Sequence, residues 1–306
     1  MGAPIEIKNV TKFYGQQKVV SEVSLVIKAG ECFGLLGSQG AGKSSLIEMI
    51  SANSPLSGGE IYVDGLNVKL NPNRVKSVIG IVPQAILFDN DFSLLDNLML
   101  FARYKGLAHK KALTQARENL RLLGMEDNED KFPEQLSDDA QKRFAIVRAL
   151  MAAPKILLID EPTLILEANT KSKIWEVLSN LKREGLTILI GSQNRDEAER
   201  VCNRIAIMEK GKILSIGAPA ELIRDEVGKE VVEFEVEKKE LDYYLSKVRD
   251  DYEYKVLNNK VRLFVKDGQL SERAIQLFSS HNILIRRASL DDVFLKVAGH
   301  ELESSL

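Results

Sequence analysis

The chain has 306 residues, of which 44% are hydrophobic and 28% are charged, as expected of a globular protein with a substantial core. Its 42 Lys and Arg are balanced by 44 Asp and Glu, so the basic surplus of nucleic-acid-binding proteins is missing and we expect no nucleic acid as a partner. The sequence shows no signal peptide and no run of about 18 apolar residues, so we expect any link to a membrane to go through another protein.

The N-terminal part predicts an antiparallel pair of strands, and then a strand, a glycine-rich loop and a helix. Ile5–Val10 and Val19–Ile27 have strand character, and Gly15 marks the turn between them. Cys32–Leu36 is a short apolar run typical of a buried strand, and helical periodicity follows in Ser45–Ala52. A strand that leads through a glycine-rich loop into a helix is the setting that a phosphate-binding loop needs.

The middle of the chain alternates strands with helices. Further strands are expected at Glu60–Val63, Ser77–Val82, Lys155–Ile159, Thr187–Ile190, Arg204–Met208 and Lys212–Ile216. Helical periodicity runs through Ser93–Gly124 in two helices, and then through Ser137–Met151, Thr170–Glu184 and Asp196–Cys202. This alternation predicts an α/β core with a parallel sheet.

The pattern changes near Asp225–Gly228. Beyond this point we expect the order β-α-β-β-α-β, which is the ferredoxin-like arrangement, with helices at Lys239–Arg249 and Ser271–Ser279. A last helix is predicted at Leu290–Val297. The predicted domains are therefore residues 1–225, with a helical subdomain at about 85–152, and a small α+β domain at 229–306.

The glycine-rich loop matches the phosphate-loop pattern G-x-x-x-x-G-K-[ST]. Its glycines let backbone N–H groups turn inward around phosphates, and the helix N-terminus adds a positive dipole. Lys43 is expected to reach the β- and γ-phosphates, and Ser44 to offer its hydroxyl to Mg²⁺. The predicted cofactors are ATP and Mg²⁺, and the predicted binding residues of the loop are Gly37, Ser38, Gln39, Gly40, Ala41, Gly42, Lys43, Ser44 and Ser45.

Later motifs, in the same order, resemble those of the ATP-binding subunits of ABC transporters. Lys155–Pro162 is an apolar strand that ends in Asp160 and Glu161, as the Walker B strand of that family does. The resemblance implies that Asp160 binds Mg²⁺ and that Glu161 polarises or positions the attacking water. It covers nearly all of Ile5–Arg224 and implies an α/β P-loop NTPase fold with an antiparallel β subdomain and a helical subdomain.

Two more residues match this family upstream of the Walker B strand. Tyr14 stands where ABC proteins place an aromatic ring that stacks on adenine, and a surface tyrosine is the alternative. Gln84 resembles the glutamine of the Q-loop, which senses Mg²⁺ and water and precedes a segment that contacts the membrane partner. The stretches Asp96–Leu107 and Ser289–Leu295 are similar to ATPase subunits of ABC-2 type exporters, which include drug-resistance and nodulation-type exporters.

The signature motif departs from the family pattern. Where the family has Leu-Ser-Gly-Gly-Gln, this chain has Leu136–Ala140, with Asp138 and Asp139 in place of the glycines. In the family, the signature of one subunit meets the ATP of the other, and a carboxylate about 4 Å from a phosphate costs roughly 1 kcal/mol in water and roughly 4 at an effective dielectric of 20. The same residues also predict a good helix start, with Ser137 as N-cap, so that the helix persists while the contact with ATP is lost.

Two further departures lie after the Walker B strand. The family has a small residue and then Leu-Asp after Glu-Pro-Thr, whereas this chain has Leu164–Glu167 with the bulky Ile165. At the switch position, the family has a histidine and this chain has Gln193, which can donate a hydrogen bond to a γ-phosphate but cannot carry a proton. Glu161 and Gln193 are therefore the candidate catalytic residues, and Ser44, Gln84 and Asp160 the candidate metal ligands.

Two functions are compatible with these motifs. In the first, the chain forms a homodimer or pairs with a second ATP-binding subunit, and ATP-driven closure and hydrolysis energise an ABC-2 type membrane permease. In the second, the chain binds ATP with impaired hydrolysis and serves as a regulatory or structural subunit, as the weak half of an asymmetric pair. Either function places the chain in the cytoplasm, peripheral on the inner face of the cell membrane.

Overall fold

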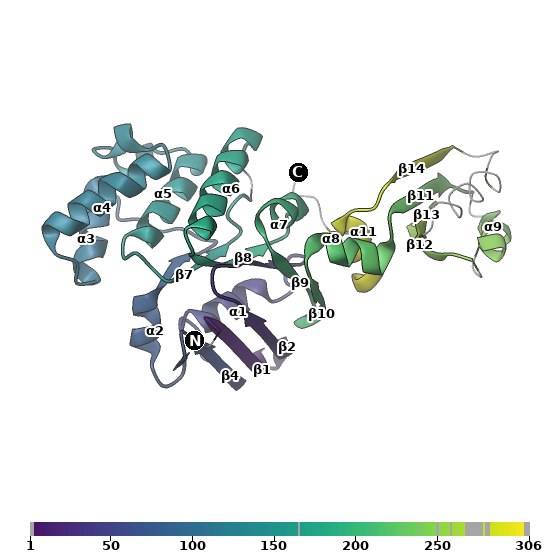
Figure 1. Cartoon of the computed structure of the whole chain (residues 1–306), viewed down its shortest axis with the longest axis horizontal. Coiled ribbons are helices and arrows are strands. Elements are labelled where there is room, and N and C mark those ends of the chain that lie inside the picture. Colours follow the sequence, from purple (N-terminus) through teal and green to yellow (C-terminus); the bar gives the residue numbers. More distant parts are fainter. Residues whose placement is uncertain are drawn as a thin grey trace. The chain divides into compact units, whose positions relative to one another are not determined.

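A computed structural model describes residues 3–164, 166–237, 239–248, 251–257, 259–266, 278 and 282–302 of the chain. These residues form two compact units, one up to Ile213 and one from Leu214 to Leu302 (Figure 1). The units are described separately below. The functional division at 1–225 and 229–306 stays a prediction.

The first unit opens with an antiparallel sheet of order β2-β1-β4-β5. Its strands are β1 (Ile5–Tyr14), β2 (Gln17–Ile27), β4 (Gly58–Val63) and β5 (Leu66–Asn67). Ile5 pairs with Ile27 and Tyr14 with Gln17, so the predicted hairpin at Gly15 is confirmed, and Gly15 has the positive φ of 59° that its turn needs.

The central sheet has the order β10-β9-β3-β8-β7-β6. Its strands are β3 (Cys32–Leu36), β6 (Ile79–Val82), β7 (Ile156–Asp160), β8 (Thr187–Ser192), β9 (Arg204–Glu209) and β10 (Lys212–Gly217). From β9 to β6 all pairs are parallel, which confirms the predicted α/β core. Every residue of β3, β7 and β8 is buried, as their unbroken apolar runs predict.

One predicted strand was wrong in part. Ser77 and Val78 belong to helix α2 (Pro72–Val78), and the strand begins only at Ile79. Proline is favoured in the first turn of a helix because it has no N–H to satisfy there, and Asn71 precedes it as N-cap. The helix that starts at Pro72 therefore continues through Val78, despite the strand propensity of valine.

Helices complete the first unit. They are α1 (Lys43–Ile50), α3 (Leu94–Tyr104), α4 (His109–Leu122), α5 (Asp138–Leu150), α6 (Ala168–Arg183) and α7 (Arg195–Val201), with short 3₁₀ turns at Glu126–Asn128 and Pro133–Gln135. In Figure 1, α3, α4 and α5 lie together at one end of this unit, as expected of a helical subdomain. Helix α3 begins where Ser93 accepts a hydrogen bond from the Asp96 amide.

The second unit contains an antiparallel sheet of order β12-β13-β11-β14, which is the ferredoxin-like order. Its elements are α8 (Pro219–Leu222), a π-helical turn (Ile223–Val227), β11 (Glu230–Glu235), α9 (Leu241–Val248), β12 (Glu253–Leu257), β13 (Lys260–Val265), β14 (Ile283–Arg287) and α11 (Leu290–Ala298). The predicted fold class is confirmed. The helix predicted at Ser271–Ser279 falls almost wholly outside the described residues.

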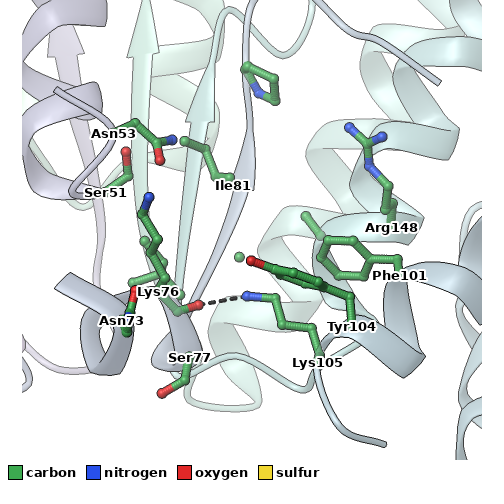
Figure 2. A pocket seen from close by; sticks show the side chains of 14 residues that line it. Ser51, Asn53, Asn73, Lys76, Ser77, Ile81, Phe101, Tyr104, Lys105 and Arg148 are labelled. Atoms are coloured by element: carbon green, nitrogen blue, oxygen red, sulfur yellow. Dashed lines mark hydrogen bonds between the residues drawn. The ribbon is translucent and has the colours of Figure 1, made fainter. Parts of the chain in front are cut away.

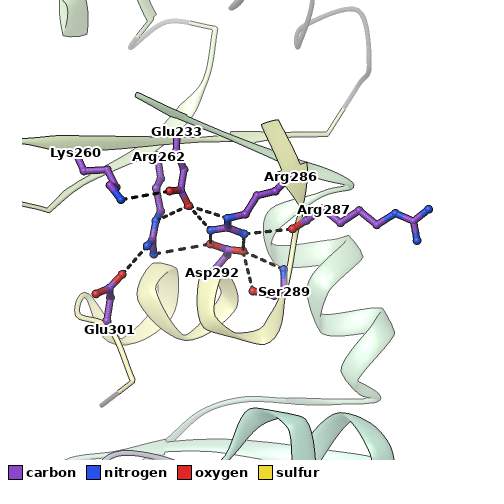
Figure 3. A network of polar contacts seen from close by, with 8 residues as sticks. All are labelled: Glu233, Lys260, Arg262, Arg286, Arg287, Ser289, Asp292 and Glu301. Carbon is purple, nitrogen blue, oxygen red and sulfur yellow. Dashed lines mark hydrogen bonds and ion pairs between the residues drawn. The ribbon is translucent and has the colours of Figure 1, made fainter. Parts of the chain in front are cut away.

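A buried charge network ties the sheet of this unit to its last helix (Figure 3). Arg286 on β14 donates to Glu233 on β11 and, through two nitrogens at 2.7 Å, to both carboxylate oxygens of Asp292 on α11. Arg262 on β13 lies 3.0 Å from the Glu233 carboxylate. Burial favours the neutral form of Asp292, but Arg286 and Ser289 outweigh it and hold the pKa of this carboxyl below its usual value.

Asp292→Asn tests this network. The substitution leaves Arg286 partly unpaired, and breaking a buried ion pair is strongly destabilising, so we expect a loss of about 2–3 kcal/mol in the opening free energy of β11 and β13, measured by hydrogen exchange. A carboxyl with a depressed pKa stabilises above its unfolded pKa and loses that contribution as the pH falls through its folded pKa. The difference in opening free energy between wild type and Asp292→Asn should therefore shrink in acid. Glu235→Gln, an exposed change on β11, is the control.

Candidate nucleotide site

Strand β8 lies between β3 and β7 and holds the ends of both. The Gly37 amide, directly after β3, donates to the Ser192 carbonyl at 3.2 Å. The Glu161 amide, directly after β7, donates to the Gly191 carbonyl at 2.8 Å. Because the carboxyl ends of parallel strands meet at one sheet edge, this pairing brings the glycine-rich loop and the acidic pair together.

The loop after β3 needs its glycines for a physical reason. Gly40 and Gly42 have φ angles of 80° and 104°, a region that side chains disfavour. A Cβ on Gly37 would stand 2.2 Å from the Met208 carbonyl oxygen, and one on Gly42 would stand 2.7 Å from the Val19 carbonyl oxygen. The loop is therefore packed so closely against the main chain of Val19 and Met208 that no side chain fits at Gly37 or Gly42.

Helix α1 starts at Lys43, and its N-cap, Gly42, has no side chain that could cap the first N–H groups. Such a helix start favours an anion. The Lys43 ammonium is buried and donates to the carbonyls of Gly37 and Ser38 at 2.9 and 3.0 Å. The Ser38 hydroxyl is turned away from the loop and donates to Glu209 on β9 at 2.5 Å.

The Asp160 carboxylate fits a metal ion. In the described part of the chain, its Oδ1 is buried and has no hydrogen-bond partner, which is costly unless something binds there. Burial raises the pKa of Asp160, and the Ser44 hydroxyl, Lys43 and Lys142 offset part of this rise. A carboxylate beside a serine hydroxyl provides the hard oxygen ligands that Mg²⁺ prefers.

Glu161 sits directly beside the phosphate loop. Its Oε1 lies 3.4 Å from the Lys43 ammonium, and its Oε2 accepts from the Gln193 amide at 3.3 Å. Its φ of 51° is unusual for a residue with a side chain, and such strain is often found at functional sites. Burial raises the pKa of Glu161, while Lys43 and the Gln193 amide oppose the rise. Gln193 thus reaches Glu161 through its main chain.

Most of the remaining predicted site residues are more exposed. The Tyr14 ring is 47% exposed at the end of β1, and the Lys12 ammonium lies 4.7 Å from its centroid. Gln39 and Gln84 are exposed, and Ala41 is buried within the loop. The Gln84 carbonyl accepts a hydrogen bond from the Lys142 ammonium at 3.4 Å. The binding and catalytic roles of all these residues stay predictions.

The altered signature forms the predicted helix start. The Ser137 hydroxyl accepts a hydrogen bond from the Ala140 amide at 3.3 Å, and α5 begins at Asp138. Asp139 also has a partner in the same chain, because its Oδ2 accepts from the Thr170 hydroxyl at 2.5 Å. Asp138 is exposed. Ile165, which departs from the family pattern after the Walker B strand, lies outside the described residues.

Two residues near the site were not singled out by their sequence. Glu197 on α7 is fully buried, and its Oε1 accepts from Thr163 at 2.9 Å and from Trp175 at 3.1 Å. Burial raises the pKa of Glu197 to about 7, although these donors lower it. Lys142 on α5 interacts electrostatically with Asp160 and Glu161. Both are charged residues within predicted helices, and charged side chains are seldom buried, so nothing in the sequence marked them.

Glu197→Gln tests the buried carboxyl. With a folded pKa of about 7, well above its usual value, the folded chain holds a proton that unfolding releases, so stability falls as the pH rises from about 4.5 to 7. Glutamine keeps an acceptor and removes the charge. We therefore expect the variant to gain about 2–3 kcal/mol of unfolding free energy over wild type between pH 5 and pH 8.

The measurement is denaturant unfolding across this pH range. Glu176→Gln, an exposed change on α6, is the control and should leave the profile unchanged. A difference in unfolding free energy between Glu197→Gln and wild type that is the same at every pH would contradict the raised pKa of Glu197.

Comparison with known proteins identifies the family. The sequence model of the ABC transporter family matches residues 20–164. The Nod factor export ATP-binding protein I of Burkholderia lata is 33% identical over 302 residues, which cover 98% of this chain and 99% of the relative. The protein of the same name from Rhizobium etli is 32% identical over 98% of this chain and 94% of its own length.

Solved structures agree with the sequence comparisons. An ATP-binding subunit of an ABC transporter is 26% identical, covers 72% of this chain and 92% of its own, and superimposes with a TM-score of 0.67. A dimeric ATP-binding cassette in a post-hydrolysis state, bound to ADP and Pi, is 28% identical over 70% of this chain and 98% of its own, with a TM-score of 0.66. The chain belongs to the ATP-binding proteins of the ABC transporter family.

Proposed function

We propose that the chain binds ATP and Mg²⁺ at the carboxyl edge of its central sheet and uses them to energise an ABC-2 type membrane permease. The observation that supports this is the convergence of three groups within one buried site. Lys43 follows β3 through the phosphate loop, whereas Asp160 ends β7 and Glu161 comes directly after it. All three residues are at most 6% exposed. An ammonium beside two carboxylates, at a helix start without a side-chain cap, provides the groups that phosphoryl transfer needs.

Each residue has a proposed task. The loop amides of 37–45 and the Lys43 ammonium hold the phosphates, and one face of Tyr14 is free of Lys12 for the adenine ring. Ser44 and Asp160, with Gln84, would hold Mg²⁺, which would supply positive charge to neutralise the phosphates. Glu161 orients the attacking water.

Gln193 completes this arrangement. Its amide already fixes the Glu161 carboxylate, and its side chain is proposed to donate to the γ-phosphate. Gln193 is therefore proposed to contact both the Glu161 carboxylate and the γ-phosphate.

The proposed active assembly contains two ATP-binding subunits. One of the similar solved structures is a dimeric cassette bound to ADP and Pi. In the proposed dimer, the signature of one subunit faces the phosphates of the other, as the family resemblance implies. Here Asp139 is held by Thr170, which leaves the exposed Asp138 as the carboxylate that meets the partner's nucleotide.

A groove in the first unit is the proposed permease contact (Figure 2). It has a volume of about 560 Å³ and runs between the central sheet and the helical subdomain. Pro83 at the end of β6 lines it together with Phe101 and Tyr104 of α3. The Tyr104 ring is 86% exposed there, so an apolar side chain of a permease segment would find an aromatic surface.

The proposed location follows from this contact. Within the described residues, no helix is long and apolar enough to span a bilayer. We place the chain in the cytoplasm, on the inner face of the cell membrane, held there by its permease.

Glu161→Gln tests the proposed function. The amide is nearly isosteric but cannot polarise water, so we expect ATP to bind with an affinity within about threefold of wild type while turnover falls by about 10²–10³. Turnover is measured as phosphate release by the full chain, and binding by titration with ATP. Equal turnover in wild type and variant would contradict a hydrolytic role for Glu161.

A second variant separates the exporter function from impaired hydrolysis. Asp138→Gly with Asp139→Gly restores the family pattern in the signature. If wild type turns over ATP above background, the exporter function stands. If only the glycine variant does so, the native chain is a hydrolysis-impaired subunit.

A further inference from the structure

The last buried position of strand β1 is occupied by a lysine. Along this strand, the buried side chains are those of Ile5, Ile7, Val10 and Lys12. Tyr14, two residues after Lys12, ends the strand and is half-exposed. Lysine is almost never fully buried unless its charge has a partner, so a lysine in this row of apolar side chains indicates a specific contact.

Two contacts hold the Lys12 ammonium at the end of the strand. The ammonium donates to the Pro55 carbonyl at 2.7 Å, and it lies 4.7 Å from the centroid of the Tyr14 ring. Lys12 is only 5% exposed. A buried charge costs free energy unless it is paired, and here a carbonyl and an aromatic face supply the partners. The ring and the ammonium therefore stabilise each other's position.

The carbonyl partner of Lys12 is itself fixed to the strand. Pro55 belongs to the segment that follows helix α1, the helix that begins at the phosphate loop. In this segment the Ser57 amide donates to the Thr11 carbonyl at 3.0 Å, and the Ser57 hydroxyl accepts from the Phe13 amide at 2.9 Å. These two hydrogen bonds flank Lys12 along the strand. The ammonium is therefore bound to main chain that is already tied to β1 on both sides.

An ammonium on one face of an aromatic ring changes the opposite face. The π electrons give a ring negative potential on both faces, which disfavours direct stacking of one ring on another. A cation on one face draws electron density toward itself, so the opposite face becomes less negative. A base that stacks on this opposite face of Tyr14 therefore meets less repulsion, and tilting the ring away would cost the contact with the ammonium.

We propose that Lys12 is a positioning residue of the nucleotide site, which holds the Tyr14 ring from behind and prepares the opposite face of this ring for a purine base. Lys12 acts through the ring and does not touch the nucleotide. Its contribution therefore appears with ligands that carry a base and vanishes with ligands that carry only phosphates. The inference rests on the proposed function, in which the adenine stacks on Tyr14.

Lys12→Met tests this role with two ligands, ATP and inorganic tripolyphosphate. Methionine keeps an unbranched side chain at the buried position and removes the charge. We expect the Kd for ATP to rise by about 3- to 10-fold, because the ring loses its cation, and the Kd for tripolyphosphate to stay within about twofold. Both are measured by calorimetric titration of the full chain with Mg²⁺ present. Lys8→Met is the matched control, since the Lys8 ammonium, also on β1, lies 4.9 Å from the centroid of the Tyr62 ring, and this variant should change neither Kd.

A double-mutant cycle shows whether Lys12 acts through the ring. Tyr14→Leu removes the stacking surface and should raise the Kd for ATP by about 10-fold, as expected for the loss of one contact between a base and an aromatic ring. In the Tyr14→Leu background, Lys12→Met should raise this Kd by less than about twofold more. An effect of Lys12→Met on ATP that is as large without the ring as with it would overturn the proposal. So would an unchanged Kd for ATP, or an equal loss for ATP and tripolyphosphate.

The contact between ammonium and ring can be measured without a nucleotide. The ring current of Tyr14 should shift the NMR signals of the Lys12 ε-methylene protons upfield, and Tyr14→Leu should abolish this shift while the Lys8 signals stay in place. A wild-type chain that shows the shift but binds no ATP would support the hold on the ring and count against the proposed function alone. Lys12 signals that are the same in wild type and Tyr14→Leu would overturn the proposal whatever the affinity for ATP.

Discussion

The position of β8 between β3 and β7 is the constraint on which the site depends. Main-chain hydrogen bonds from Gly37 and Glu161 to the last two residues of β8 fix the phosphate loop and the acidic pair at one sheet edge. Gly191 permits this, since a Cβ there would stand 2.8 Å from Ile47 and 3.0 Å from Asp160. The buried contact between Lys43 and Glu161 follows from strand order, because their strands are not sequence neighbours.

The altered signature keeps the helix start of α5 and makes a further contact within its own chain. Asp139 replaces a family glycine and finds a hydroxyl on Thr170 at the start of α6. A glycine has no side chain to accept that hydrogen bond. The first turn of α5 is thus connected within its own chain to the segment that follows the acidic pair, and helix-start chemistry at Ser137 keeps the turn intact.

Much of the fold and the core of the site could be predicted because their signals are local. The loop Gly37–Ser44 and the pair Asp160-Glu161 carry their chemistry and their strand setting in short stretches. The strand predicted at Ser77–Val82 was wrong at its start because a proline-led helix preceded it. The contacts of Glu197 and Lys142 could not be predicted, since their partners lie 22 to 58 positions away and a charged side chain in a helical pattern does not reveal whether it is buried.

The central claim is that ATP and Mg²⁺ are held by Lys43 and Asp160 across this sheet edge. Calorimetric titration of the full chain with ATP, with and without Mg²⁺, tests it most directly. Lys43→Ala should weaken ATP binding by about 10- to 100-fold, since a charge-assisted contact contributes about 1.5–3 kcal/mol. In Asp160→Asn, Mg²⁺ should lose its effect on ATP affinity while Mg²⁺-free binding persists. ATP affinity and Mg²⁺ dependence that are the same in wild type and both variants would contradict the account.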